Sequence, residues 1–420
     1  MKRMFPSLFC FLLSMTILAE DVPFNIVEGL FDATVKETLG LSRIPGEETV
    51  TIYAAADEGP HYSNGVVLTA FKGRLYCMWQ TSSVDEDAED TWVAYACSSD
   101  EGKTWSKPMV LCPSISNGYC ASGGWLSTDD RLIGFVNVHP QDIPEGGYTQ
   151  FVESFDGLTW TDPEDVTMND GTRLNGIIEQ DFHIVNDGRI VGAAHFQPGL
   201  KLCPIYTEDP TGRTGWHKGS FQYTDNGVQS AELEPSFFQN QEGRWIMTMR
   251  DQKSSYTVLA AFSDDEGETW TNAVKTNMPD SRSKQCAGNL PDGTAFIVNN
   301  PGRIFNDSNK VWRIPLALTL SIDGKAFNRS YLLRSGEDSD YPRRRYEGKA
   351  KTLGYSYPKA FVHNGWLYVS YSTNKEDVEY TRVPINAISL GNENATQAEE
   401  TSRKIMEKES RRMKKEAGEM

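Results

Sequence analysis

The chain has 420 residues, of which 39% are hydrophobic and 11% aromatic, and its formal net charge at pH 7 is -17. This length is enough to bury a large core and allows one to three domains. The negative charge argues against DNA, RNA and anionic membranes as partners, because these ligands bind basic patches. An anionic ligand would have to be held by local positive charge.

Residues 1–19 are predicted to be a signal peptide. They have a basic start at residues 2–3, an apolar run at 5–18 and the small residue Ala19 before an acidic pair. A short buried helix is the alternative. The apolar run is too short to span a membrane, as is every later one. The protein is therefore expected to be secreted or periplasmic, with a single domain over residues 20–392.

Neither a metal nor another cofactor is expected. The sequence has no CxxC pair, His cluster, zinc-ligand spacing, Gly-rich phosphate loop or Ser-His-Asp signature. An exported protein could oxidise its cysteines, although some of them lie in apolar strand patterns and fit a core equally well. The six that follow the predicted signal peptide are Cys77, Cys97, Cys112, Cys120, Cys203 and Cys286.

Six hairpin turns recur along the chain, and each is flanked by alternating apolar runs such as "LYCMW" or "LYVSY". Asp-Gly or Asn-Gly between such runs is the strongest short-range hairpin signal. Six similar β units are therefore predicted. The turns lie at residues 71–75, 129–132, 186–190, 241–245, 291–295 and 363–367.

A second repeated turn follows the hairpins. Its Ser and Asp side chains can bond nearby backbone N–H groups, Gly allows positive φ, and an aromatic ring packs beneath. Near-complete copies lie at Ser99–Trp105, Ser154–Trp160 and Ser263–Trp270, a weaker copy at Ser321–Phe327, and degenerate copies at Thr207–Trp216 and Ser372–Asn374. These segments resemble the Asp boxes of sialidase-like propellers over roughly residues 55–390. The resemblance implies an all-β, six-bladed β-propeller with four-stranded antiparallel blades around a central channel.

The two ends of the domain are expected to differ. The run "TVTIYAAA", within residues 22–56, is predicted to add an outer strand that closes the ring against the last blade. Residues 393–420 are highly charged with little apolar patterning, so they are predicted to be a frayed helix or a disordered tail. A partner-binding helix is the alternative.

Polar residues stand at the start of the predicted first strand of most blades, and these starts meet at one mouth of the channel. Carboxylates, tyrosines and a histidine converging there favour a sugar site over a purely structural channel. The segments are His61–Asn64, Glu179–Asp181, Glu232–Pro235, Lys284–Cys286 and Tyr355–Lys359. The predicted substrate contacts among them are Glu179, Asp181, Gln285, Tyr355 and Lys359.

The second half of the chain resembles exo-sialidases more closely. "ELEPSFFQNQEGRWIMTMRDQ" places Glu234 and Arg250 as that family places a Glu and a substrate-binding Arg, and Arg313 matches another such Arg. "GYSYPKAF" falls where the family carries its nucleophilic Tyr, and Tyr357 fits slightly better than Tyr355. The resemblance implies that Glu234 takes the proton of Tyr357 while the arginines bind a substrate carboxylate.

A general acid is also needed, and the acidic loop "SSVDEDAEDTW" offers Asp85, Asp87 and Asp90, with Asp87 as the predicted residue. The plainer interpretation of this loop is a solvated turn. Structural alternatives also exist for Arg250, as a core-edge ion pair, and for the tyrosines, as packing.

One feature departs from the sialidase pattern. The family carries Arg-Ile-Pro on the first strand of blade one, whereas Arg43-Ile44-Pro45 lies well before that strand, and His61–Asn64 occupies the position instead. Some sialidase-like propellers remove rhamnose from glucuronate by hydrolysis or elimination with His chemistry, so His61 could act as acid and base.

The first prediction is exo-acting cleavage of a terminal residue on an anionic glycan. The alternatives are a rhamnosyl-glucuronate hydrolase or lyase and a non-catalytic glycan- or protein-binding propeller.

Overall fold

A computed structural model describes residues 22–143, 146–197, 201–221, 234–253, 255–302, 312–336 and 343–390. The predicted signal peptide and charged tail lie outside these residues. No helix in the described ranges is both long and apolar enough to cross a membrane.

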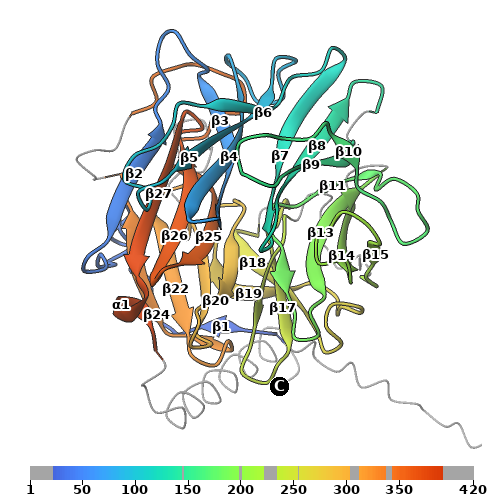
Figure 1. Cartoon of the computed structure of the whole chain (residues 1–420). Helices are drawn as coiled ribbons and strands as arrows, with labels where there is room; N and C mark the ends of the chain where they lie inside the picture. Colours follow the sequence, from blue (N-terminus) through green and yellow to red (C-terminus); the bar gives the residue numbers. More distant parts are fainter. Residues whose placement is uncertain are drawn as a thin grey trace, which may run out of the picture.

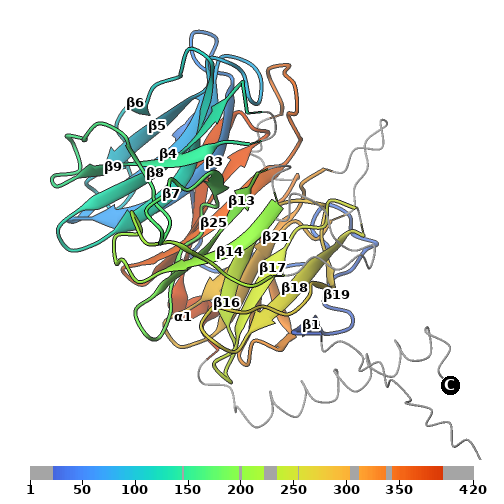
Figure 2. The same ribbon diagram turned by 90° about the vertical axis from the view of Figure 1, so that its right-hand side faces the viewer.

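Six antiparallel sheets are arranged as the blades of a ring, in chain order (Figures 1 and 2). Blade one is β3 (Tyr62–Phe71), β4 (Arg74–Ser82), β5 (Trp92–Ser98) and β6 (Met109–Cys112), and blade two is β7 (Gly118–Ser127), β8 (Leu132–Pro140), β9 (Tyr148–Ser154) and β10 (Glu164–Asp165). Blade three is β11 (Gly176–Ile178) and β12 (His183–Ile184), both paired with β13 (Ile190–Phe196), then β14 (Lys201–Thr207) and β15 (His217–Lys218).

The second half of the ring repeats this pattern. Blade four is β16 (Ser236–Gln239), β17 (Trp245–Met249), β18 (Thr257–Ser263) and β19 (Val274–Pro279). Blade five is β20 (Cys286–Asn289), β21 (Ala295–Asn299), β22 (Leu316–Ser321) and β24 (Arg329–Arg334), and blade six is β25 (Tyr355–His363), β26 (Trp366–Thr373), β27 (Asp377–Pro384) and β2 (Glu48–Tyr53). A short helix, α1 (Ile385–Ile388), follows blade six. The predicted all-β, six-bladed propeller is confirmed.

The core lies between neighbouring blades. The second strand of blade one is buried along almost its whole length, because the sheet packs against a blade on each side. Met78 of that strand shares one hydrophobic cluster with Trp125 and Val136 of blade two. Burial on both faces explains why such strands are apolar at consecutive positions rather than at alternate ones.

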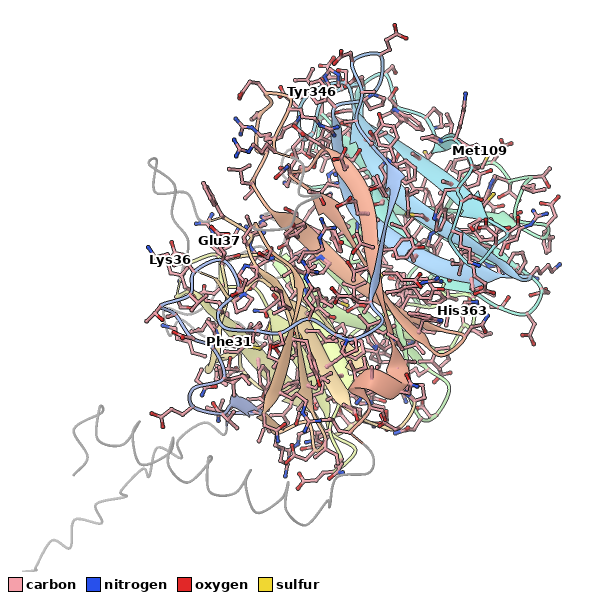
Figure 3. All side chains as sticks on the ribbon, turned by 90° about the vertical axis from the view of Figure 1, so that its left-hand side faces the viewer. Phe31, Lys36, Glu37, Met109, Tyr346 and His363 are labelled. Carbon is pink, nitrogen blue, oxygen red and sulfur yellow. The ribbon has the colours of Figure 1, made fainter. Side chains whose placement is uncertain are left out.

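The ring is closed by a strand from the start of the chain, as predicted. Strand β2 pairs antiparallel with β27, and Thr49 lies opposite Thr381. The preceding segment runs around the outside of the sheets, where Figure 3 shows Phe31, Lys36 and Glu37. Its strand β1 (Asn25–Ile26) pairs in parallel with β23 (Ala326–Phe327), a contact that the sequence did not predict.

The predicted Asp boxes are confirmed as hydrogen-bonded turns between the third and fourth strands. In blade four, Ser263 donates to Asp265 at 2.8 Å and accepts the Gly267 N–H at 3.0 Å. Two details were wrong. The serine of the first box is Ser98, which accepts the Gly102 N–H at 2.9 Å. Residues 372–374 form no such box, because they lie where the second strand of blade six ends and turns toward the third, at the opposite end of the blade.

Candidate active site

A cavity of about 1250 Å³ opens at the end of the ring opposite the Asp boxes. It is lined by residues at the starts of first strands and in the turns that join second to third strands. The ring therefore brings together side chains from every blade. Those used below are Asn64, Glu86, Asp87, Tyr119, Glu179, Gln180, His195, Glu234, Arg250, Lys284, Arg313, Tyr357 and Lys375.

The centre of the cavity wall is formed by Tyr357, Glu234 and Arg250. An Arg250 Nη1 donates to Glu234 Oε2 at 2.6 Å and to the Tyr357 hydroxyl oxygen at 3.5 Å. Burial raises the pKa of Glu234, but Arg250, Lys284 and hydrogen bonding from Tyr357 offset this, so its pKa lies below its ordinary value. Burial and the charge of Glu234 raise the pKa of Tyr357 well above 10. Tyr357 is thus a protonated phenol beside an ionised carboxylate.

Arg313 lies over the face of Tyr357, with its Cζ 5.1 Å from the ring centroid. It is 7% exposed, and its Nη1 is buried without a hydrogen-bond partner among the residues that the structure describes. Asp280, whose pKa burial raises to about 6, is close enough for Arg250 and Arg313 to lower that value electrostatically. Asp280 also accepts the Ser283 N–H at 2.8 Å. Arg313 therefore offers a buried N–H donor at the cavity wall.

A second set of charges lies on blades three and five. Lys284 contacts Glu179 and donates to Gln180 at 3.1 Å, while His195 Nδ1 is 3.1 Å from the other oxygen of Glu179. Burial alone would raise the pKa of Glu179, but Lys284 and His195 bring it below its ordinary value. Because the first strand of blade three is broken between β11 and β12, Glu179 and Gln180 lie at an interruption in the ladder.

A third ion pair joins blades six and one. Lys375 Nζ is 2.6 Å from Glu86 Oε1, which also accepts from the Tyr62 hydroxyl at 2.8 Å and from Asn64 Nδ2 at 3.4 Å. The ammonium lies 5.4 Å from the Tyr357 ring centroid. Cations from three blades therefore lie around Tyr357, with Arg250 at its hydroxyl and Arg313 and Lys375 at its ring.

Asp87 lies at the cavity wall, where protein surrounds its carboxyl group although part of the residue faces solvent. Burial by its surroundings and the charge of Glu86 raise its pKa, and a hydrogen bond from Tyr119 partly offsets the increase. The other two candidate acids are turn residues. Asp85 accepts the Lys349 N–H at 2.5 Å, and Asp90 accepts the Ser83 N–H at 3.0 Å. Of the three aspartates, Asp87 alone lines the cavity.

Four of these side chains come from residues with left-handed backbone. The φ angles of Glu234, Tyr357, Lys375 and Asp87 are 41°, 57°, 56° and 60°. Residues other than glycine rarely adopt this conformation, and each instance costs on the order of 1–3 kcal/mol when it is strained. At Tyr357 the strand also shifts register between Ser356 and Lys359, so the usual alternation of side chains is broken there.

Several residues predicted to contact substrate lie elsewhere. Tyr355 is fully buried and donates to the Ser335 carbonyl at 2.8 Å. Gln285 is also fully buried, and its amide lies against the Met249 and Arg250 backbone. Lys359 Nζ and Asp181 Oδ2 are 3.6 Å apart, and neither residue lines the cavity. For Lys359 the reason is the register shift between Ser356 and Lys359, which moves it away from the cavity.

The predicted position of His61 in the mouth was also wrong. The His61 ring stacks on the Tyr346 ring with a centroid distance of 3.8 Å, and its Nε2 lies 3.2 Å from the Ala56 carbonyl oxygen. His61 does not line the cavity. Figure 3 shows Tyr346 on a loop at the edge of the molecule, far from His363 at the hairpin end of blade six. Arg43 donates to the Leu333 carbonyl of blade five at 2.8 Å, as expected of a connecting segment. Asn64 occupies the blade-one position in the cavity.

Sequence reasoning missed Lys375, Glu86 and His195 as site residues, and within the segment Lys284–Cys286 it chose Gln285 rather than Lys284 as the substrate contact. One signal existed for Lys375: it follows the second strand of blade six, much as Arg250 directly follows the second strand of blade four. Glu86 lies beside Asp85 and Asp87, which the sequence analysis had named as candidate acids. No local pattern distinguished His195 from a core histidine.

Comparisons with known proteins agree with this architecture. The model of the BNR repeat-like domain matches residues 73–369, which is more than half of the chain. No curated protein matches the sequence at a significant level.

Three solved structures illustrate the similarity of the fold. A sialidase has 17% identity and a TM-score of 0.53, over 86% of this chain and 35% of its own length. This chain thus spans about a third of that protein. A Hadza microbial sialidase has 16% identity and a TM-score of 0.62, over 81% and 69% of the two chains. The intramolecular trans-sialidase from Ruminococcus gnavus, in complex with oseltamivir carboxylate, has 13% identity and a TM-score of 0.57, over 84% and 100%.

At these identities the solved structures show the fold alone, and the family model adds membership. The chain therefore belongs to the BNR repeat-like domain family, and its propeller fold is similar to that of sialidases.

Proposed function

We propose that the protein is an exo-acting glycoside hydrolase of sialidase type, which releases a terminal acidic sugar from a glycan. The observation that carries this proposal is the placement of the Tyr357 hydroxyl beside both Glu234 and Arg250 in a cavity wall. A phenol with a raised pKa is a poor nucleophile until a base removes its proton, and an ionised carboxylate lies next to it. The pair formed by Tyr357 and Glu234 can therefore supply a nucleophile and its base.

The reaction proceeds in two displacements. As the Tyr357 oxygen bonds to the anomeric carbon, its proton passes to Glu234, the glycosidic C–O bond breaks and Asp87 protonates the leaving oxygen. In the second step Asp87 takes a proton from water and the water oxygen bonds to the anomeric carbon. The bond between the Tyr357 oxygen and that carbon breaks at the same time, and the Tyr357 oxygen recovers its proton from Glu234. The raised pKa of Asp87 suits the acid role, because a carboxyl must be protonated to donate.

The acidic group of the sugar is assigned to Arg313 and Arg250. Arg313 Nη1 is a buried donor that has no partner in the described ranges of the chain. The Arg313 guanidinium lies over the Tyr357 ring, and that of Arg250 lies beside the Tyr357 hydroxyl. A guanidinium fork binds a carboxylate in bidentate geometry, which fixes the sugar ring as well as attracting it.

The test is a panel of terminal-sugar substrates incubated with the full chain and with the Tyr357→Phe variant. Release of free sialic acid by the wild type, but not by the variant, is the expected result. Release of rhamnose, or ultraviolet absorbance from an unsaturated uronate, would instead identify the rhamnosyl-glucuronate alternative. Binding of glycans with no product from any substrate would identify the non-catalytic propeller.

A further inference from the structure

We propose that Lys375 and Glu86 form a resident ion pair at the anion-binding wall, and that the acidic group of a bound sugar replaces Glu86 on Lys375. This inference rests on the proposed function, because it concerns how the same cavity takes up an acidic sugar. It adds a specificity-determining cation from blade six and an internal carboxylate that competes with the ligand.

The position of Lys375 is fixed by two blades. It lies in the turn between β26 and β27, its backbone carbonyl accepts the Ser63 N–H of blade one at 2.9 Å, and the adjacent Asn374 N–H donates to Gly354 at 2.8 Å. The Lys375 side chain is 3% exposed and lines the cavity. Its ammonium is therefore held next to Tyr357 whether or not a ligand is present.

The cavity cations are not equally available. Arg250 is paired with Glu234, Lys284 with Glu179, and Lys375 with Glu86, whereas Arg313 forms no ion pair within the part of the chain that the structure describes. An acidic sugar thus meets one uncommitted cation beside the tyrosine. A second cation becomes available to the sugar only if one of these carboxylates separates from the cation with which it is paired.

Of the three paired carboxylates, Glu86 can separate from its cation at the lowest cost. Its side chain is 20% exposed, compared with 11% for Glu234 and 9% for Glu179. Separating a buried ion pair is costly because one charge is left without water or partner, and this cost falls as solvent reaches the group. Glu86 also keeps the Tyr62 hydroxyl as a donor at 2.8 Å. The geometry thus selects Glu86, rather than Glu234 or Glu179, for exchange with the ligand.

The exchange predicts opposite effects for the two partners. Lys375→Met removes a cation from the ligand, so acidic sugars should bind more weakly. Glu86→Gln removes the competing charge and keeps an acceptor for Tyr62, so the same ligands should bind more tightly. If the pair only stabilised the fold, both substitutions would weaken binding.

The experiment measures dissociation constants by calorimetry for the full chain at low ionic strength. The probes are sialic acid and glucuronic acid, each compared with its uncharged methyl ester. The wild type is expected to prefer each acid. Lys375→Met should reduce that preference by about tenfold or more, since a charge-assisted hydrogen bond is worth about that factor. Lys375→Arg should retain most of it, and Glu86→Gln should increase it.

The outcomes separate this inference from the proposed function. A wild type that prefers the acids, together with a Lys375→Met variant of unchanged preference, overturns the inference and leaves the proposed function intact. Weaker acid binding by both Lys375→Met and Glu86→Gln also overturns it. A wild type that binds neither acid overturns both. Thermal unfolding of each variant identifies any that has lost its fold. If Lys375→Met is one of them, the test uses Lys375→Arg and Glu86→Gln, whose side chains are similar in shape to the originals.

Discussion

The two ends of the ring are built from the same strands, but they hold their polar side chains in different ways. At the Asp-box end, Asp265 accepts the Thr269 N–H at 2.8 Å and the Ser263 hydroxyl at 2.8 Å, all within one turn. At the cavity end, Glu86 pairs with Lys375, which is 289 residues later in the sequence. Glu179 pairs with Lys284, which is 105 residues later. One end repeats local hydrogen bonds that define turns, whereas the other uses long-range charge pairs that depend on the closed ring.

The difference also appears in the acidity of the carboxyl groups. Thr104 and Ser98 donate to Asp100 in its Asp box and hold its pKa at about 2. At the cavity, burial raises the pKa of Asp280 to about 6, and burial and a neighbouring charge raise that of Asp87. Changes at the Asp-box end should therefore affect stability, and changes at the cavity end should affect chemistry first.

The largest expected effect separates two tyrosines of the same strand. Tyr357→Phe removes the proposed nucleophile and should lower kcat by a factor on the order of 10³ or more. Tyr355→Phe loses the hydrogen bond that the Tyr355 hydroxyl donates to the Ser335 carbonyl, away from the cavity, so it should lower the free energy of unfolding by about 1 kcal/mol and leave kcat almost unchanged. Steady-state kinetics and urea unfolding of both variants check this. Equal losses of kcat would show that Tyr357 has no special role.

The next effect distinguishes Asp87 from its neighbours in the acidic loop. Asp87→Asn should lower kcat by about 10²–10⁴-fold on a substrate whose leaving oxygen needs a proton, and by much less on one with an acidic phenol as leaving group. Because the pKa of Asp87 is raised and its acid form donates, wild-type activity should fall as pH rises through that pKa. The variant should lack this alkaline fall.

Asp90→Asn is the matched control for this comparison. Asp90 belongs to the same loop but accepts the Ser83 N–H and does not line the cavity. Its variant should keep both the rate and the pH profile of the wild type. A profile altered equally by both substitutions would point to the loop rather than to one acid.

Much of the Asp-box end could be predicted from sequence, because its order is local. A Ser, an Asp and a Gly within a few residues suffice to specify each turn, so the Asp boxes of blades one to five were found, although the first serine was misplaced by one position. The closing strand was predictable for a similar reason, because its alternation is visible in the run itself.

The cavity end was predictable only in part. Glu234, Arg250 and Tyr357 were found through resemblance to a family, which carries long-range information that one sequence lacks. Lys375 and Glu86 had no such guide, since nothing local indicates that residues 289 positions apart form a pair. The position of Lys359 was wrong because the register shift after Ser356 breaks the alternation on which the prediction relied.

A third prediction concerns Asp280, a buried carboxyl near Arg250 and Arg313. Its pKa in the folded protein is about 6, above the ordinary 3.8, so its proton stabilises the fold. This contribution is complete below about pH 4 and is lost as pH rises through about 6, which corresponds to about 3 kcal/mol. Asp280→Asn should remove this dependence and be the more stable protein at pH 7. Urea unfolding from pH 4 to pH 8 checks it, and a variant less stable than wild type at pH 7 would contradict it.

The smallest expected effect lies in the Asp box of blade five. Asp323 is 4% exposed and accepts the Ser321 hydroxyl at 2.8 Å, the Lys325 N–H at 2.8 Å and the Ala326 N–H at 3.0 Å. Asp323→Ala leaves these donors without their acceptor, so the free energy of unfolding should fall by about 1–3 kcal/mol. Because the box lies at the end of the blade away from the cavity, kcat and the acid-to-ester preference should not change. A folded Asp323→Ala protein with altered kcat would show that the two ends of a blade are coupled, and the division of roles between them would then fail.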